Sequence, residues 1–176
     1  MEVEVKFRVN LEDIKKRLEG IGAKFSHYEF QEDIYFSIPR PKLLRVRAVH
    51  NNGKAYLTYK EIRDERNGEF YEVEVEVENF EKTVEILRRL GFEVEVIVRK
   101  HRWVYKIGDI TFELNRVEGA GDFLDIEVID DDVHRAKEKI WTVARRLGLG
   151  EEDVEPRLYT ELLSEASRVK KRGISG

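Results

Sequence analysis

Apolar and charged residues alternate from the start of the chain. Val3, Val5 and Phe7 are separated by Glu4 and Lys6. This period of two is typical of a β-strand with one apolar and one charged face. The alternation returns between short turn-forming segments along most of the sequence. It predicts eight strands, at about residues 2–9, 26–37, 43–50, 54–62, 69–78, 93–106, 110–117 and 123–129.

The links between several of these strands are short. Asn52-Gly53 is a hairpin signal between the third and fourth strands, and Gly108-Asp109 is a hairpin signal between the sixth and seventh. A polar loop over residues 63–68 joins the fourth strand to the fifth. Links of this length favour antiparallel pairing of consecutive strands.

Three amphipathic helices are predicted between the strands. Asn10, Asn79 and an aspartate within residues 130–132 can each cap the start of a helix. Glycines follow each helical stretch and can end it. The second helix is expected to turn its apolar face inward, with the residues Phe80, Val84, Leu87 and Leu90.

The C-terminal part contains a fourth helical signal. It follows Pro156 and covers about residues 159–166. The basic, glycine-ended segment 168–176 is expected to fray. No low-complexity linker divides the sequence, so we predict a single domain over residues 1–176.

The composition narrows the class of protein. Charged residues make up 39% of the 176 residues, yet the net charge is only -4, so both signs are mixed. A protein that coats nucleic acid would be basic, so no nucleic-acid partner is expected. Cysteine is absent, which excludes a thiolate metal site. The lack of a long apolar run predicts a cytoplasmic protein with no membrane partner, and the excess of charged residues over glutamine suggests a thermophilic source.

The charged faces admit two interpretations. Each could point to water, as in many antiparallel sheets. However, acids gather on the fifth and eighth strands and cations on the third and sixth, and eight strands are enough to close a barrel. If helices cover the apolar faces outside, the charged faces line the interior, which requires a charged ligand. A polyphosphate with a divalent metal would satisfy both signs.

At this point the sequence resembles a known family. The hallmark of the CYTH superfamily, the triphosphate tunnel metalloenzymes, is similar to Glu2-x-Glu4-x-Lys6. The resemblance covers nearly the whole chain and implies an α+β fold, an eight-stranded antiparallel β-barrel or tunnel with a charged lumen and helices packed outside. It is carried further by Asp33-x-Tyr35-Phe36, Leu44-Arg45-x-Arg47, Thr58-Tyr59-Lys60, Glu72-x-Glu74, Lys100-x-Arg102, Gly121-x-Phe123-x-Asp125-x-Glu127 and Tyr159-Thr160-Glu161-Leu162-Leu163.

The resemblance also implies roles for individual residues. Asn115 stands where the family usually has an acid, and Asp125 stands where Glu is usual. Glu113 shares the strand face of Asn115 and could compensate for the missing acid. The implied ligands of Mg²⁺ or Mn²⁺ are Glu2, Glu4, Glu72, Glu74, Asp125 and Glu127. The implied triphosphate-binding residues are Lys6, Arg45, Arg47, Lys60, Lys100 and Arg102, and the implied catalytic residues are Glu4, Glu127, Asn115 and Glu113.

The implied function is that of an enzyme acting on a triphosphate-bearing small molecule. The resemblance is nearest to the class IV adenylyl cyclases, which convert ATP to cyclic AMP and pyrophosphate. The alternatives are a triphosphatase acting on thiamine triphosphate, tripolyphosphate or a nucleoside triphosphate, and a protein that binds triphosphates without turnover. A homodimer is a further open alternative.

Overall fold

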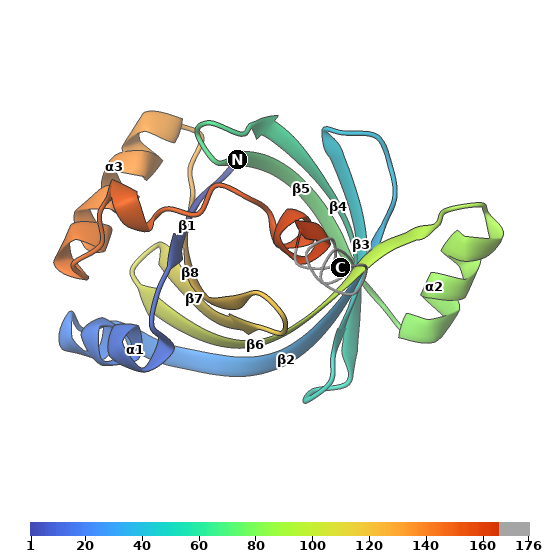
Figure 1. Ribbon diagram of the computed structural model, residues 1–176, viewed down its shortest axis with the longest axis horizontal. Helices are drawn as coiled ribbons and strands as arrows, with labels where there is room; N and C mark the ends of the chain where they lie inside the picture. The colour runs from blue at the N-terminus through green and yellow to red at the C-terminus, as the bar shows by residue number, and fades with distance from the viewer. Residues whose placement is uncertain (166–176) are drawn as a thin grey trace, which may run out of the picture.

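The computed structural model describes residues 1–165, and its centre is a closed barrel of antiparallel strands (Figure 1). The order around the barrel is β1-β5-β4-β3-β2-β6-β7-β8. Each predicted strand is present, with ends that differ by two residues or fewer, and the predicted α+β barrel is confirmed. The strands are β1 (Glu2–Arg8), β2 (Lys24–Phe36), β3 (Lys42–Val49), β4 (Lys54–Asp64), β5 (Glu69–Val77), β6 (Val94–Ile107), β7 (Ile110–Val117) and β8 (Gly121–Ile129).

The hydrophobic core lies outside the barrel, between its wall and two helices. Helix α1 (Leu11–Gly20) packs on β7, and α3 (Val133–Arg146) packs on β1 and β8. The predicted caps are present, since Asn10 accepts a hydrogen bond from the N–H of Asp13 and Asp132 accepts one from that of Arg135. The outward residues of the strands are buried here, which leaves the charged faces inside; the core includes Val3, Phe7, Leu18, Phe112, Leu124, Ile126 and Ile140.

Helix α2 (Phe80–Arg89) differs from the expectation. It begins at the predicted cap, but none of its residues is buried. The helix packs mainly against β3 and β4 and projects from the barrel (Figure 1). Phe80, Val84 and Leu87 are partly buried, as expected for the inward face of the helix, but Leu90 is 70% exposed and the prediction is wrong there. Among the described residues, no helix is long and apolar enough to cross a membrane.

The C-terminal part of the described chain returns to the barrel and crosses one end of it (Figure 1). After the short helix η1 (Glu151–Asp153), Val154 bridges to Phe7 and the N–H of Glu155 donates to the carbonyl of Lys6 at 2.8 Å. Residues 159–165 are helical, as predicted, and Leu162 packs on Val98 and Phe123. The segment 168–176, predicted to fray, lies outside the described residues.

The barrel closes at a short seam between β1 and β5. These strands pair only at Glu2 with Phe70 and at Val3 with Glu69. The N–H of Glu4 then donates to the carbonyl of Gly68 at 3.0 Å. A Cβ at position 68 would lie 2.1 Å from the Glu4 oxygen, and φ there is +66°, so only glycine fits. This contact fixes the backbone of Glu4, whose side chain faces inward.

Candidate functional site

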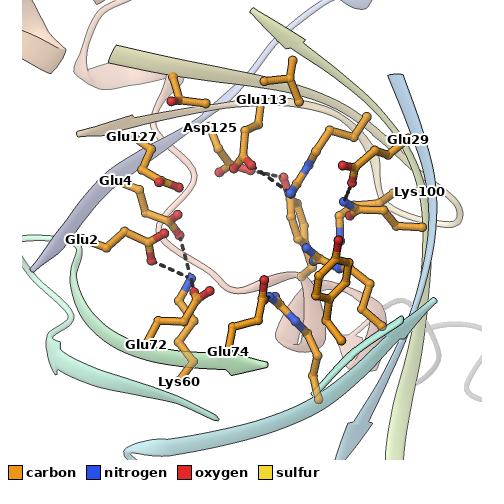
Figure 2. A pocket seen from close by; sticks show the side chains of 18 of the residues that line it. Glu2, Glu4, Glu29, Lys60, Glu72, Glu74, Lys100, Glu113, Asp125 and Glu127 are labelled. Carbon is orange, nitrogen blue, oxygen red and sulfur yellow. Dashed lines mark hydrogen bonds and ion pairs between the residues drawn. The ribbon is translucent and has the colours of Figure 1, made fainter. Parts of the chain in front are cut away.

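The charged faces of the strands enclose a cavity of about 380 Å³ (Figure 2). This volume is within the usual range for small-molecule sites. Among residues 1–165, eight carboxylates and seven lysines and arginines line the cavity, so their charges are nearly balanced. It is lined by every residue implied by the resemblance except Asn115: Glu2, Glu4, Lys6, Arg45, Arg47, Lys60, Glu72, Glu74, Lys100, Arg102, Glu113, Asp125 and Glu127.

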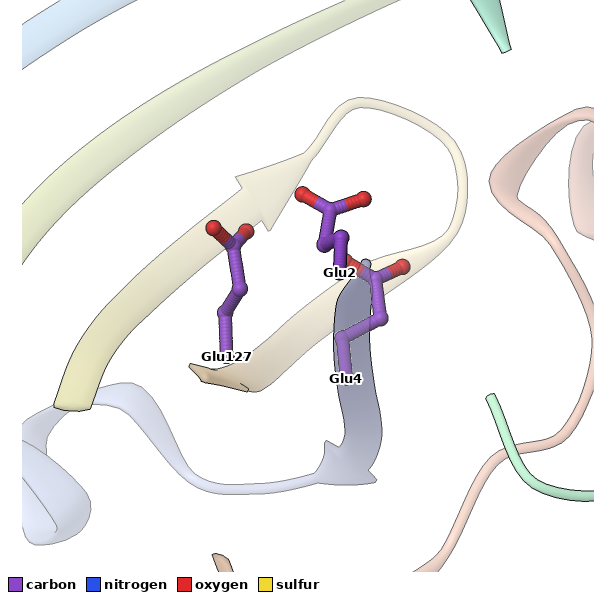
Figure 3. Close-up of side chains that lie close together, drawn as sticks. All are labelled: Glu2, Glu4 and Glu127. Atoms are coloured by element: carbon purple, nitrogen blue, oxygen red, sulfur yellow. The ribbon is translucent and has the colours of Figure 1, made fainter. Parts of the chain in front are cut away.

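Three carboxylates gather on one wall of the cavity. Glu2 and Glu4 come from β1 and Glu127 from β8, and each offers an oxygen within 4.8 Å of the others (Figure 3). Glu4 and Glu127 are direct neighbours in the antiparallel register of β1 and β8. Glu2 is two residues from Glu4, so strand periodicity places it on the same face. We call these three residues the acid cluster.

The acid cluster has the electrostatics of a cation site. Burial, together with the charges of Glu113 and Glu2, raises the pKa of Glu127 to about 10. Burial also raises the pKa of Glu4, with Glu2 and Glu113 adding to the effect and Lys60 opposing it. A divalent cation would favour the ionised forms, and carboxylate oxygens are what Mg²⁺ and Mn²⁺ prefer. The residues present therefore fit such a metal.

The remaining acids predicted as metal ligands lie outside the acid cluster. Glu74 Oε2 accepts hydrogen bonds from Thr58 at 2.8 Å and Arg45 at 3.3 Å. Glu72 faces Lys60 across the β4–β5 pair. Asp125 Oδ2 accepts a hydrogen bond from Tyr159. In this geometry these three acids interact with basic and polar side chains of the barrel instead of with the acid cluster.

In the part of the chain that the structure describes, Lys60 is the one cation that forms ion pairs with the acid cluster. Its Nζ lies 3.2 Å from Glu2 Oε2, 3.7 Å from Glu4 Oε1 and 3.9 Å from Glu72 Oε2 (Figure 2). Burial acts to lower the pKa of Lys60, but the charges of Glu4 and Glu2 outweigh it and raise the pKa. The ammonium group is therefore held in its charged form beside three carboxylates.

A second buried group holds two of the predicted triphosphate-binding cations. Asp33 is fully buried and accepts hydrogen bonds from Arg47 Nε at 2.6 Å, from Arg47 Nη2 at 2.8 Å and from Lys100 Nζ at 2.7 Å. Burial opposes ionisation, yet Arg47 and Lys100 hold the pKa of Asp33 well below its usual value. Burial and the neighbouring Arg47 and Arg102 lower the pKa of Lys100 to about 7, against the pull of Asp33.

Arg45 is held less completely. Within residues 1–165 its guanidinium makes only long contacts, at 3.5 Å to Tyr35 and to Thr58 and at 3.3 Å to Glu74. The Nε atom is buried and has no hydrogen-bond partner among residues 1–165. An unpartnered donor on a permanently charged group is well suited to an anion.

Asn115 is not among the lining residues, but it joins two of them that carry opposite charges, Arg102 and Asp125. It is fully buried; its Oδ1 accepts from Arg102 Nε at 2.8 Å and its Nδ2 donates to Asp125 Oδ2 at 2.8 Å. Nδ2 also donates to the Tyr159 hydroxyl at 3.0 Å, and that hydroxyl donates to Asp125 at 2.6 Å. An amide can serve a cation and a carboxylate together, whereas an acid here would face Asp125 with like charge. Arg102 also pairs with Glu113 at 2.9 Å.

Several lining residues escaped the sequence analysis. His27, Glu29 and Gln31 line the cavity, and they share the face of β2 with Asp33. The period of two, counted back from Asp33, could have found them. Tyr159 carried no such signal, because it enters the cavity from the C-terminal segment. Its ring lies 4.1 Å from Lys6 Nζ, which also donates to the carbonyl of Arg157 at 2.8 Å.

The barrel and its charged interior have counterparts in known proteins. A protein of Methanocaldococcus jannaschii, named only as a candidate adenylate cyclase, is 32% identical over 173 residues, which span 91% of this chain and 98% of that protein. The adenylate cyclase CyaB of Aeromonas hydrophila is 25% identical over 176 residues, spanning 93% of this chain and 90% of that protein.

A solved structure shares the whole described architecture. A Pyrococcus horikoshii protein is 63% identical, with a TM-score of 0.91, over 93% of this chain and 99% of that chain. The names of the two relatives support an enzyme at the level of the family. The CYTH domain model matches residues 1–159, and the chain belongs to the CYTH family.

Proposed function

We propose that the protein is a metal-dependent enzyme that cleaves the triphosphate group of a small molecule inside the barrel. The observation that carries the proposal is the presence, in one cavity, of the acid cluster and of buried arginines and lysines. Carboxylates suit a divalent cation, and guanidinium groups suit phosphate oxygens. Few other ligands would compensate both sets of charges at once.

The preferred reaction is that of an adenylate cyclase, which the names of two relatives support. The 3′-oxygen of ATP attacks the α-phosphorus in line, the bond to the β-phosphate oxygen breaks, and the products are cyclic AMP and pyrophosphate. A divalent cation held by Glu2, Glu4 and Glu127 would polarise the phosphate oxygens. Arg45 and Arg102 compensate the charge that develops on those oxygens.

Asp125 is suited to accept the proton of the attacking hydroxyl. Its Oδ2 is occupied by Asn115 and Tyr159, while its buried Oδ1 has no hydrogen bond within the described chain. Burial, with Glu4 and Glu113 adding to the effect and Lys6 opposing it, raises the pKa of Asp125 to about 6. A base with a pKa near neutrality is efficient at physiological pH.

Hydrolysis of a triphosphate is the second candidate reaction. Among the described lining residues, only Leu43, Val104 and Leu158 offer aliphatic surface to the organic part of a substrate. The charged groups recognise phosphates, so water could replace the ribose hydroxyl as the attacking group. This feature favours thiamine triphosphate, tripolyphosphate or a nucleoside triphosphate as alternative substrates.

A product analysis tests the proposal. ATP and tripolyphosphate are each incubated with the protein and Mg²⁺ or Mn²⁺, and the products are separated by ion-exchange chromatography. Cyclic AMP with pyrophosphate supports the cyclase, and inorganic phosphate from either substrate supports the triphosphatase. If both compounds bind but neither changes, with either metal, the enzyme proposal is wrong and the protein is a binder. Glu127→Gln is the matched control for metal dependence.

A further inference from the structure

The ammonium group of Lys60 lies beside two of the carboxylates that would bind a metal ion. Glu2 and Glu4 belong to the acid cluster, and both are within 4 Å of Lys60 Nζ. Figure 2 shows this side chain between the acids of β1 and those of β5. In the described chain, the acid cluster and its lysine thus form a set in which one positive charge balances part of the negative charge.

The contacts of Lys60 are electrostatic rather than directional. Glu2 Oε2 is buried and lies 3.2 Å from Nζ, yet it accepts no hydrogen bond among residues 1–165. The other two contacts, to Glu4 and Glu72, are longer still. Lysine carries its charge on a flexible stem. The ammonium group can therefore leave the acids without breaking a well-aligned hydrogen bond.

A metal ion binding alone would meet a like charge at this position. Lys60 would have to move away from Glu2 and Glu4, whose charges favour its ammonium form. A polyphosphate would change the balance, since its oxygens could receive the displaced ammonium group. Binding of either ligand would then reduce the electrostatic repulsion that opposes binding of the other.

We propose that Lys60 is a resident counter-ion of the acid cluster which keeps metal affinity low until a polyphosphate draws its ammonium group away. This inference rests on the proposed function, because it assumes that metal and polyphosphate share the cavity. Coupling of this kind is reciprocal, so metal and polyphosphate each raise the affinity for the other. A site organised in this way would avoid holding metal in the absence of substrate.

The test is the affinity for Mn²⁺ in the absence of any polyphosphate, measured by titration calorimetry on the full chain. Lys60→Met removes the charge and keeps the length of the side chain. Mn²⁺ should bind Lys60→Met about tenfold more tightly than the unchanged protein, inside the range typical of coupled sites. Lys60→Arg keeps the charge and should bind Mn²⁺ as weakly as the unchanged protein.

A matched control comes from the same cavity. Lys106 also lines the cavity, but it belongs to β6 and makes no ion pair among the described residues. Lys106→Met should leave the affinity for Mn²⁺ unchanged. If it tightens Mn²⁺ binding as much as Lys60→Met does, the effect is one of total charge and the inference is wrong.

The remaining outcomes separate this inference from the proposed function. Equal or weaker Mn²⁺ binding by Lys60→Met, with a circular dichroism spectrum that shows an intact fold, overturns the role of Lys60 alone. Lys60→Gln repeats the measurement if the methionine variant does not fold. If neither the unchanged protein nor any variant binds Mn²⁺, with or without tripolyphosphate, the acid cluster is not a metal site. Both the inference and the proposed function are then wrong.

Discussion

Removing the Asp33 carboxylate should destabilise the free protein strongly. Asp33→Asn keeps the shape of the side chain but removes the charge that holds Arg47 and Lys100. Breaking a buried ion pair by removing one partner costs about 3–5 kcal/mol. We expect the lower end, about 3 kcal/mol, because Lys100, with its pKa near 7, can lose its proton and so avoid an unpaired charge. For a chain of this length the melting temperature should fall by about 6–12 °C.

The assay is urea unfolding followed by circular dichroism, with and without tripolyphosphate. Asp122→Asn is the matched control, because Asp122 forms the same two-bond pair with Arg116 on the exposed surface, at 3.0 and 3.2 Å. An exposed pair of this kind contributes less than about 1 kcal/mol. Tripolyphosphate should stabilise Asp33→Asn more than the unchanged protein, since the two released cations can then bind phosphate.

The pH dependence follows from the lowered pKa of Asp33. Its stabilising effect is complete above the ordinary pKa of an aspartate, about 3.9, and disappears as the pH falls through the lower value of the folded state. The part of the stability gap that arises from Asp33 should therefore persist at pH 5 and close only in stronger acid. A loss below about 1 kcal/mol at pH 7 would refute the reasoning, since it would mean that the two cations do not depend on Asp33.

Two substitutions and one binding measurement test the site further. Glu127→Gln should abolish metal-dependent turnover of the triphosphate and leave the circular dichroism spectrum unchanged; retained turnover would contradict the role of the acid cluster. Asn115→Asp should lower kcat at least about tenfold, because it sets a second carboxylate 2.8 Å from Asp125; an unchanged kcat would show that the amide is not needed. Tripolyphosphate binding at pH 8 should take up protons, since Lys100 has a pKa near 7 and an anion raises it. Calorimetry in two buffers of different ionisation enthalpy measures that uptake, and equal enthalpies would contradict it.

The sequence was sufficient to predict which side chains share a strand face. Strand parity assigns one face to Glu2 and Glu4 and the other to Val3 and Val5. The inward placement of the acids also required the closed barrel with helices outside, which the family resemblance implied and the structure confirms. The limits of this reasoning appear at α2. Amphipathicity shows that a helix has an apolar face, but it does not show whether a surface large enough to cover that face is nearby.

Partners within the cavity could not be predicted, because they depend on register. Asp33 meets Arg47 because these residues are opposite each other in the β2–β3 pair, and Lys100 reaches Asp33 from the next strand. The catalytic role of Asn115 stays a prediction. Its hydrogen bonds to Arg102 and Asp125 could not be predicted, because they require knowing that β7 lies between β6 and β8.

The order of strands also explains how the barrel tolerates so many inward charges. The sequence groups acids on β5 and cations on β3, and the fold inserts β4, with Lys60, between them. It then places Asp33 of β2 between the cations of β3 and those of β6. On this side of the barrel each group of one sign therefore has a neighbour of the other, which offsets much of the penalty of burying it, whereas the acids of β1 and β8 lie side by side. A polyphosphate with its metal carries charges of both signs, so each phosphate or metal charge can replace one partner of an internal ion pair. The arrangement that stabilises the free barrel therefore also prepares it for binding.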